Sequence, residues 1–579
     1  MRSIRRSIFG RVGWVVLFTL SMLAASLADG RPAFADTAVG TLVPTPGKNF
    51  TLTRDNTAFD SYGAAVRAIE GSTAVTLATP LDVTQGGGSK GRTLCHPTDI
   101  NDTYHYNGFC WSEADDTTSA VSNVHPGGWT PQGLTASHDA GLEPGGTYQG
   151  HQLVISSWYY GVGWSDDPAT NLSLKDRFGR ISIVDATGAS WNYGHVMLVK
   201  PTGSGATANY VPVEKIHADG VAWYRNYLYV ANGGELQVYD LNHLWKMKAF
   251  DDRTNIENNI SSAMHHGWAL PMVGRYYTKV QPDARSCPGE DQACFSSLSV
   301  DRNGSSHNLV SGAFLGPDDP RTGHIARWPL NETTGLLDAD SAGLVTKTDA
   351  YATPVAGIQG VAKGDRWYYI SAICPAGYRG TNPATLYTCI YRAEPNGPVT
   401  VLTRTPTMTQ NLSYSTYSKR LWGLNEKDTL RTVFSLVPTT ADASVYLEND
   451  YSKLCAGGES GLDNGHRVIQ WGCINAQDER WVFEPTTDAL GNPAYFLRNE
   501  YSGKCMGTGS KLDNGTGMIQ WACNGAVDEK WWYDETTREL RNVYSGKCLG
   551  LGSGAAKGSQ LIQWTCNGAA DEKWNQVPR

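Results

Sequence analysis

The pattern of apolar and polar residues between residues 36 and 437 predicts short β-strands in repeating sets. A five-residue phrase, in which a small polar residue introduces an apolar strand-like run, occurs five times. One or two further strand-like segments follow each phrase. Short alternating or apolar runs bounded by turn residues are typical of strands. The five phrases are Pro131–Thr135, Ala218–Ala222, Phe295–Ser299, Ile358–Ala362 and Thr409–Ser413. The pattern therefore predicts an all-β region.

The spacing of these sets indicates how the strands are arranged. The sets recur about every 50 to 90 residues, which is typical of β-propeller blades, each a small antiparallel sheet beside a central channel. We therefore predict a β-propeller of five or more blades over residues 36–437. The unassigned stretch Thr41–Ser119 and the gap between Gln132 and Asp219 leave room for a sixth or seventh blade.

A clearer repetition occupies the C-terminal end of the chain. Three cysteine pairs there are each separated by 18 residues, and a tryptophan follows each second cysteine by eight residues. A unit of about 43 to 50 residues has too little apolar surface to close a core alone, so three units must pack together. The pattern predicts a β-trefoil over residues 444–579, after a linker at 438–443. The three tryptophans are Trp481, Trp531 and Trp574.

These repeats resemble the ricin-B-type lectin family, whose Gln-x-Trp triplets have become Glu-x-Trp in all three repeats here. The resemblance implies that the three tryptophans lie at the trefoil core. It also implies carbohydrate binding, with a sugar stacked on an aromatic platform beside polar groups. Plain packing is the alternative role for the platform residues. The implied platform residues are Trp471, Trp521 and Trp564, and the implied polar contacts are Asp478, Asp528 and Asp571.

One departure from the family concerns its usual sugar-binding aspartate, which lies two residues after the first cysteine of a repeat. Replacement acceptors could come from the Asp463-Asn464 and Asp513-Asn514 pairs. The third repeat has no such pair, so we expect it to be the least able to bind sugar. The residues at the aspartate positions are Gly457, Gly507 and Gly550.

The N-terminus predicts export from the cell. Residues 1–35 combine an Arg-rich start, an apolar stretch and Ala33-Phe34-Ala35, which is the order of a secretory signal. The Arg5-Arg6 pair fits either ordinary or twin-arginine export. No later segment is apolar for long enough to span a bilayer. We therefore expect a secreted, extracellular protein without a membrane partner.

Charge and cysteine content narrow the partners further. Without residues 1–35 the chain keeps 43 Lys and Arg against 55 Asp and Glu, which argues against a nucleic-acid partner. An even number of cysteines in an oxidising compartment predicts six disulfides. We expect a monomer without a cofactor. The twelve cysteines are Cys95 with Cys110, Cys287 with Cys294, Cys374 with Cys389, Cys455 with Cys473, Cys505 with Cys523 and Cys548 with Cys566.

Candidate catalytic residues lie where the inner strands of the predicted propeller begin. Asp219 is the only carboxylate among the first polar residues of the five phrases, and His217 precedes it by two residues. In an extended strand both side chains share one face, so this pair is the candidate acid/base pair. A turn-capping aspartate and a surface histidine are the alternative. The other first polar residues are Gln132, Ser296, Gln359 and Gln410.

Substrate contacts are expected from Gln132, Gln359 and Gln410, and Trp158 is a candidate saccharide platform, with aromatic core as its alternative. No histidine pair has a metal-site spacing, so we predict no catalytic metal. Together these features predict a carbohydrate-active enzyme that the trefoil holds near a polymeric glycan.

Four functions fit this interpretation to different degrees. A glycoside hydrolase needs two carboxylates, of which only Asp219 is identified. A polysaccharide lyase needs a base such as His and amide or cationic groups. The alternatives are a non-catalytic carbohydrate-binding or adhesion protein, and a hydrolase of a lactone or ester that uses the lectin only as an address.

Overall fold

The structure is a computed structural model that describes most of the chain after residue 37. The predicted signal at residues 1–35, Cys287 and most of the predicted linker lie outside the described residues. The description covers residues 38–578 except for 48–49, 102–103, 105, 118–127, 144, 162–177, 189, 279–292, 305, 317–322, 365–366, 376–377, 379–387, 439–443, 475, 491 and 553.

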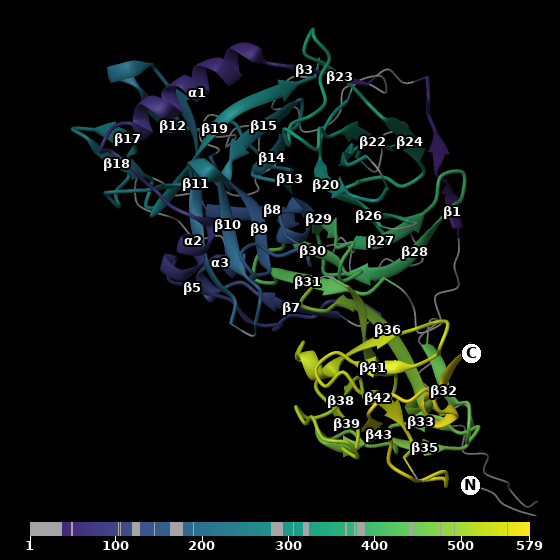
Figure 1. The fold of residues 1–579 in the computed structure, drawn as a ribbon. Helices are drawn as coiled ribbons and strands as arrows, with labels where there is room; N and C mark the ends of the chain where they lie inside the picture. The colour runs from purple at the N-terminus through teal and green to yellow at the C-terminus, as the bar shows by residue number, and fades with distance from the viewer. Residues whose placement is uncertain are drawn as a thin grey trace, which may run out of the picture. The chain divides into compact units, whose positions relative to one another are not determined.

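Five antiparallel strand sets occupy residues 38–437, and their first strands lie next to one another. Contacts run from β8 to β13, β20, β25, β29 and back to β8, so these strands form a nearly closed barrel. Figure 1 shows β8, β13, β20 and β29 near the middle of this half of the chain. The first strands are β8 (Gly128–Ala136), β13 (Gly220–Tyr224), β20 (Ser297–Asp301), β25 (Gly360–Lys363) and β29 (Thr409–Tyr414).

Behind each first strand, further antiparallel strands follow in sequence order. The all-β prediction is confirmed. β11 and β19 also pair in parallel, which joins the first two sets into one sheet. The following strands are β9 (Leu153–Gly161), β10 (Gly179–Asp185) and β11 (Asn192–Thr202); β14 (Tyr227–Asn232), β15 (Glu235–Asp240) and β19 (Trp268–Tyr277); β21 (Asn308–Gly312), β22 (Gly323–Pro329) and β24 (Asp349–Thr353); β26 (Tyr368–Ile373), β27 (Thr388–Ala393) and β28 (Pro398–Thr405); and β30 (Leu421–Asn425) and β31 (Thr432–Leu436).

Strands from the start of the chain complete the outer edges of these sheets. β7 (Tyr106–Cys110) pairs with β31, and β6 (Arg92–Thr93) pairs with β7. The last set is thus closed by residues more than 300 positions earlier in the chain. Outer and peripheral strands are β1 (Ala38–Thr41), β2 (Val43–Pro44), β3 (Thr51–Arg54), β4 (Thr76–Leu77), β5 (Ser89–Lys90), β12 (Asn209–Pro212), β16 (Trp245–Lys246), β17 (Thr254–Glu257), β18 (Ile260–Ala263) and β23 (Leu344–Thr346).

Helices are few, and the strand pattern did not predict them. Asp55 caps α1 (Asn56–Glu70) by accepting a hydrogen bond from the Ala58 amide at 3.0 Å. Thr79 and Asp82 form a capping box at α2 (Pro80–Gly86). The two shortest helices are α3 (Glu113–Asp116) and α4 (Ser137–Ala140). In the described part of the chain, no helix has both the length and the apolar character needed to cross a membrane.

Small residues let the first strands approach one another closely. Gly133, Gly220 and Gly360 occupy the same place in three of the five phrases. A Cβ at Gly133 would lie 2.6 Å from Val221 N, and one at Gly360 would lie 2.9 Å from Leu412 N. Only glycine therefore fits these positions without moving the neighbouring strand.

Asn411 occupies the equivalent position in β29 and is completely buried. Its Nδ2 donates to the carbonyl oxygens of Leu298 (2.7 Å), Leu134 (2.8 Å) and Val221 (3.4 Å). Its Oδ1 accepts from the Leu298 amide at 3.1 Å. The free edge of a sheet leaves such backbone groups unpaired, and buried polar groups need partners. One side chain thus satisfies edge groups of three other strand sets.

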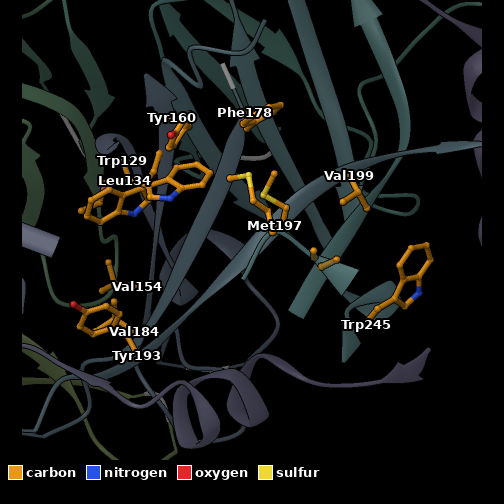
Figure 2. Packing of buried hydrophobic residues seen from close by; sticks show 14 of the residues in the cluster. Trp129, Leu134, Val154, Tyr160, Phe178, Val184, Tyr193, Met197, Val199 and Trp245 are labelled. Carbon is orange, nitrogen blue, oxygen red and sulfur yellow. The ribbon is translucent and has the colours of Figure 1, made fainter. Parts of the chain in front are cut away.

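Aromatic and aliphatic side chains pack together between the strands of the N-terminal half. Trp129, Tyr160, Phe178, Met197 and Trp245 belong to one buried cluster that several strands contribute to, and Figure 2 shows its packing. Burial of this apolar surface is the main favourable contribution to folding.

The C-terminal region folds as the predicted β-trefoil. β44 returns to pair with β32, which closes the three repeats. The strands are β32 (Ser444–Asn449), β33 (Cys455–Gly457), β34 (His466–Arg467), β35 (Ile469–Trp471), β36 (Arg480–Thr487), β37 (Pro493–Asn499), β38 (Cys505–Gly507), β39 (Ile519–Trp521), β40 (Lys530–Tyr533), β41 (Leu540–Asn542), β42 (Cys548–Gly550), β43 (Ile562–Trp564) and β44 (Trp574–Pro578).

The tryptophans expected at the trefoil core are fully buried. Their indole nitrogens each donate to a backbone carbonyl of their own repeat at 2.9 Å. The glutamates of the Glu-x-Trp triplets accept backbone N–H bonds from the loop after the second cysteine, as Glu479 does from Ile474 at 2.9 Å. A carboxylate therefore serves where the family has a glutamine. The buried tryptophans are Trp481, Trp531 and Trp574.

Five of the six predicted disulfides are confirmed. They are Cys95–Cys110, Cys374–Cys389, Cys455–Cys473, Cys505–Cys523 and Cys548–Cys566. Cys294 is also disulfide-bonded, and its expected partner Cys287 lies outside the described residues.

Replacing Asn411 with alanine should strongly destabilise the N-terminal half. The change leaves several buried edge groups of three strands without a partner, and each costs about 1–3 kcal/mol. We expect a loss of at least about 3 kcal/mol, measured as a shift of the urea unfolding midpoint. Asn192→Ala, at an exposed site of β11, is the matched control. Similar midpoints for the two variants would contradict the role assigned to Asn411.

Candidate functional site

His217 and Asp219 lie together at the entrance to β13. The His217 Nδ1 and Asp219 Oδ1 atoms are 2.6 Å apart. Both side chains are partly exposed, at 27% and 22%. The predicted pair therefore meets, and solvent reaches it.

The backbone between them differs from the expected extended strand. Ala218 has a left-handed φ of 54°, and its carbonyl accepts a hydrogen bond from Ser157 Oγ at 2.9 Å. For a residue with a Cβ this conformation costs roughly 1–2 kcal/mol, and such strain clusters at functional sites. The two side chains meet across a turn rather than along one face of a strand, which corrects the local prediction.

Neighbouring residues fix the His217 ring. It stacks on Tyr159 of β9 with ring centroids 4.5 Å apart. The His217 amide donates to Asn232 Oδ1 at 3.0 Å. The ring thus has a defined orientation toward Asp219.

Glu426 is a second carboxyl group near this pair, and the sequence pattern did not predict it. It directly follows β30 and is only 5% exposed. Gln132 Nε2 donates a hydrogen bond to its carboxyl group. Burial raises the pKa of Glu426 to about 7, against the opposing effect of His217 and with the support of the Asp219 charge. The charges of His217 and Asp219 therefore act on the Glu426 carboxyl group.

Backbone contacts hold Glu426 in place. Its amide donates to the Met408 carbonyl at 3.2 Å, and its carbonyl accepts from Arg431 Nε at 3.2 Å. Arg431 is 1% exposed, and its NH1 donates to the Asp115 carbonyl at 2.8 Å. The turn that carries Glu426 is thereby tied to α3.

The other first polar residues of the five phrases have different surroundings. Gln132 and Gln410 are buried, at 2% and 1% exposed. Gln410 Nε2 donates to the Met408 carbonyl at 3.2 Å. Ser296 Oγ donates to the carbonyls of Gly312 and Ile358. Gln359 is half-buried just before β25.

Trp158 does not present a ring face to solvent. It is completely buried, its ring contacts Trp111 at 4.8 Å, and the Arg180 guanidinium lies 4.7 Å from its ring centroid. The expected saccharide platform is thus covered on the inside of the protein, and Trp158 packs as core.

A buried ionic cluster surrounds Arg180. Asp115 bonds Arg180 NH2 at 2.9 Å, Tyr193 Oη at 2.7 Å and His195 Nε2 at 3.1 Å. Burial acts to raise the pKa of Asp115, but His195 and Arg180 hold it well below its usual range. Because Asp115 bonds the other three groups of the cluster, we assign the cluster a structural role.

Metal binding finds little support in the described residues. The two groupings with suitable geometry are Cys95, His96 and Cys110, and Glu539, Cys548 and Glu572. Each includes cysteines that form disulfides, so neither set offers free thiolate ligands.

The implied sugar-platform tryptophans of the trefoil are exposed. Their exposed fractions are 44%, 43% and 43% for Trp471, Trp521 and Trp564. The aspartates expected beside them are engaged in turns, since Asp478 and Asp528 accept from the Ser460 and Ser510 amides at 2.8 and 2.9 Å. Asp571 is half-buried.

Comparison with known proteins identifies the C-terminal region. Residues 443–575 match the model of the ricin-type β-trefoil lectin domain. The designed threefold-symmetric protein ThreeFoil is 23% identical over 24% of this chain and 99% of its own, with a TM-score of 0.22. The C-half of an earthworm R-type lectin, solved with GalNAc, is 11% identical over 24% of this chain and 99% of its own, with a TM-score of 0.20.

Another solved structure aligns over a larger share of the chain. An exo-β-1,3-galactanase from Clostridium thermocellum is 13% identical over 73% of this chain and 94% of its own, with a TM-score of 0.24. No curated protein matches the chain. The family match covers no residue before 443.

The pH dependence of stability should report the raised pKa of Glu426. The pKa of Glu426 in the folded protein, about 7, exceeds its usual value of 4.5. The contribution of Glu426 to the free energy of unfolding is therefore full below about pH 4.5 and is lost as the pH rises through about 7. The loss is on the order of 3 kcal/mol. We expect Glu426→Gln to flatten the fall of the urea midpoint over this range.

The exposed Glu113 provides the control for this experiment. Glu113→Gln should keep the pH dependence of the wild type. An equal fall with pH in the Glu426→Gln protein would show that Glu426 is not the group responsible.

Proposed function

Residues 443–575 form a ricin-type β-trefoil lectin domain, and from this premise we propose that the chain is a secreted glycoside hydrolase that acts on a polymeric glycan. The lectin domain supports glycan binding, and the disulfides fit an oxidising compartment. In this proposal residues 1–35 are the signal, 36–437 the catalytic domain, 438–443 the linker and 444–579 the lectin domain.

The catalytic domain is, in this proposal, a five-bladed β-propeller. Each strand set is one blade, and its first strand lines the axis. The cyclic order of contacts among β8, β13, β20, β25 and β29 supports this interpretation. So does the completion of the last set by β7, because this pairing joins an N-terminal strand to the C-terminal strands of the ring.

The observation that carries the proposal is the raised pKa of Glu426, to which the charge of Asp219 contributes. A glycosidase needs an acid that is protonated near neutral pH and a second carboxylate. Burial gives Glu426 a pKa of about 7, which suits proton donation to the glycosidic oxygen. Asp219 is more exposed and bonded to His217, which suits a base or nucleophile on the sugar side.

The supporting residues have separate tasks. Gln132 orients the Glu426 carboxyl through its Nε2. His217 orients Asp219 through the 2.6 Å contact. The separation of the two carboxyl groups in the substrate complex would decide between retention and inversion.

Two observations weigh against the lyase alternative. A lyase needs free amide or cationic groups to neutralise the sugar carboxylate. Gln132 is bonded to Glu426, and Arg431 is buried and bonded to two backbone carbonyls. These nearby candidates are already engaged within the protein.

Asp219→Asn and Glu426→Gln should each reduce glycan hydrolysis by about 10²–10⁴-fold, measured as reducing-end release on a polysaccharide panel. Wild-type activity should fall as the pH rises through about 7, because Glu426 must be protonated. Glu113→Gln, at an exposed acid outside the candidate site, is the control and should leave the rate unchanged.

Other outcomes separate the alternatives. Absorbance at the unsaturated-uronide band, without hydrolysis, would establish a lyase. Full activity of both carboxyl variants would refute the assigned site. Glycan binding without turnover on any substrate of the panel would favour the non-catalytic binding protein.

A further inference from the structure

We propose that the sugar sites of the trefoil are assembled between neighbouring repeats, so that a loop of one repeat serves the platform tryptophan of the next. This inference rests on the proposed lectin function. It changes which tryptophans bind: Trp521 and Trp564 are the functional platforms, and Trp471 is not.

Each exposed tryptophan lies against a glycine of another repeat. A Cβ at Gly465 of the first repeat would lie 3.7 Å from the ring of Trp521 in the second. The equivalent distance from Gly515 to Trp564 is 3.8 Å. The equivalent distance from Gly558 of the third repeat to Trp471 of the first is 3.6 Å. The loop of each repeat therefore packs against the platform tryptophan of the next repeat, and the third repeat packs against the first.

Backbone hydrogen bonds fix this arrangement at all three junctions. The amides of Gly465, Gly515 and Gly558 donate to the carbonyls of Gln520, Gln563 and Gln470 at 2.8, 2.9 and 2.8 Å. Each of these glutamines directly precedes a platform tryptophan. The loop of one repeat is thus bound to the strand that carries the next platform.

Asparagine side chains add a second anchor at two junctions. Asn464 Oδ1 accepts from the Ala522 amide at 2.9 Å and from Lys504 Nζ at 2.8 Å. Asn514 Oδ1 accepts from the amide and hydroxyl of Thr565 at 3.0 and 3.1 Å. Each asparagine therefore reaches the residue that follows a platform tryptophan.

An exposed aspartate precedes each of these asparagines. Asp463 and Asp513 are both exposed, and each is next to the anchored asparagine. A carboxylate beside an exposed indole can accept bonds from sugar hydroxyls while the apolar sugar face stacks on the ring. The first two loops thus supply the carboxylates that are missing at Gly507 and Gly550.

The third junction has different chemistry. The loop against Trp471 is Ala556-Lys557-Gly558, with no Asp-Asn pair. Ala556 stands where the other loops have an aspartate, and Lys557 stands where they have the asparagine. A Cβ at Gly472 would lie 3.1 Å from Lys557 Nζ, so this junction has an ammonium group in place of the asparagine and no carboxylate. The missing Asp-Asn pair of the third repeat therefore affects the platform of the first repeat, not its own.

The acceptors within a repeat are less suited to sugar binding. Asp478 and Asp528 each use one carboxylate oxygen to hold the turn at Ser460 or Ser510. Only glycine stands at the family's usual aspartate positions, such as Gly457. The neighbouring loop is then the better source of an exposed carboxylate.

Single substitutions in the full chain test the assignment. The probe is a printed array of mono- to tetrasaccharides, followed by titration of the strongest binder in solution. We expect Trp521→Ala and Trp564→Ala each to weaken binding at least about fivefold, and Trp471→Ala to leave it unchanged. Binding that depends on Trp471 but not on Trp564 would overturn the inference and place each site within one repeat.

A double-mutant cycle tests the partnership across repeats. Asp463→Asn should weaken binding in the Trp564→Ala protein, where the Trp521 site remains, and should add no loss in the Trp521→Ala protein. The opposite pattern would overturn the inference. Glu535→Gln, at an exposed acid of the second repeat, is the control for charge alone, and near-ultraviolet circular dichroism checks that the trefoil is folded.

The array also separates this inference from the proposed function. If the wild-type chain binds no saccharide on the array, the lectin function fails and the inference fails with it. If the wild type binds but the tryptophan pattern differs from the one expected, only the inter-repeat assignment fails.

Discussion

The side-chain amide of Asn411 is the contact on which the N-terminal half most depends. Each first strand is the edge of its sheet, and an unpaired edge in a dry interior is costly. Asn411 bonds edge groups of three other first strands, while glycines at three equivalent positions let neighbouring first strands approach closely. Closing the strands in this way also brings Gln132 to Glu426, 294 residues away in the chain.

The candidate site follows from this closure. Because Glu426 lies beside the inner strands, water is largely excluded from its carboxyl group, and burial raises its pKa to about 7. His217 and Asp219 lie nearer to solvent, on a turn held by Ser157. Two carboxyl groups in unlike surroundings are the arrangement that acid–base catalysis on sugars requires. In the proposed function, the lectin domain holds the catalytic domain near a polymeric substrate.

Local repetition in the sequence predicted much of this. The trefoil could be predicted because cysteine and tryptophan spacings within each repeat report its packing directly. The five phrases located the first strands and the His217–Asp219 pair. α2 could have been found from Thr79 and Asp82, whose spacing signals a helix start.

What could not be predicted depends on contacts between distant segments. Glu426 directly follows β30, the second strand of the last set, and only the antiparallel pairing of β30 with β29 places it near the entrance of the inner strands. Trp158 has the sequence context of a strand end, which says nothing about Arg180 and Trp111 covering its ring. Likewise, the repeat pattern does not show that each trefoil loop packs on the next repeat's tryptophan.

Difference infrared spectroscopy of the carboxyl stretch between acidic and alkaline pH tests the central claim most directly. We expect a protonated-carboxyl band that is lost with a midpoint near pH 7 and is absent from the Glu426→Gln protein. In Asp219→Asn the midpoint should be lower, because the neighbouring negative charge that raises it is gone. A band that persists in Glu426→Gln, or a midpoint unchanged in Asp219→Asn, would contradict the pairing of these two carboxyl groups.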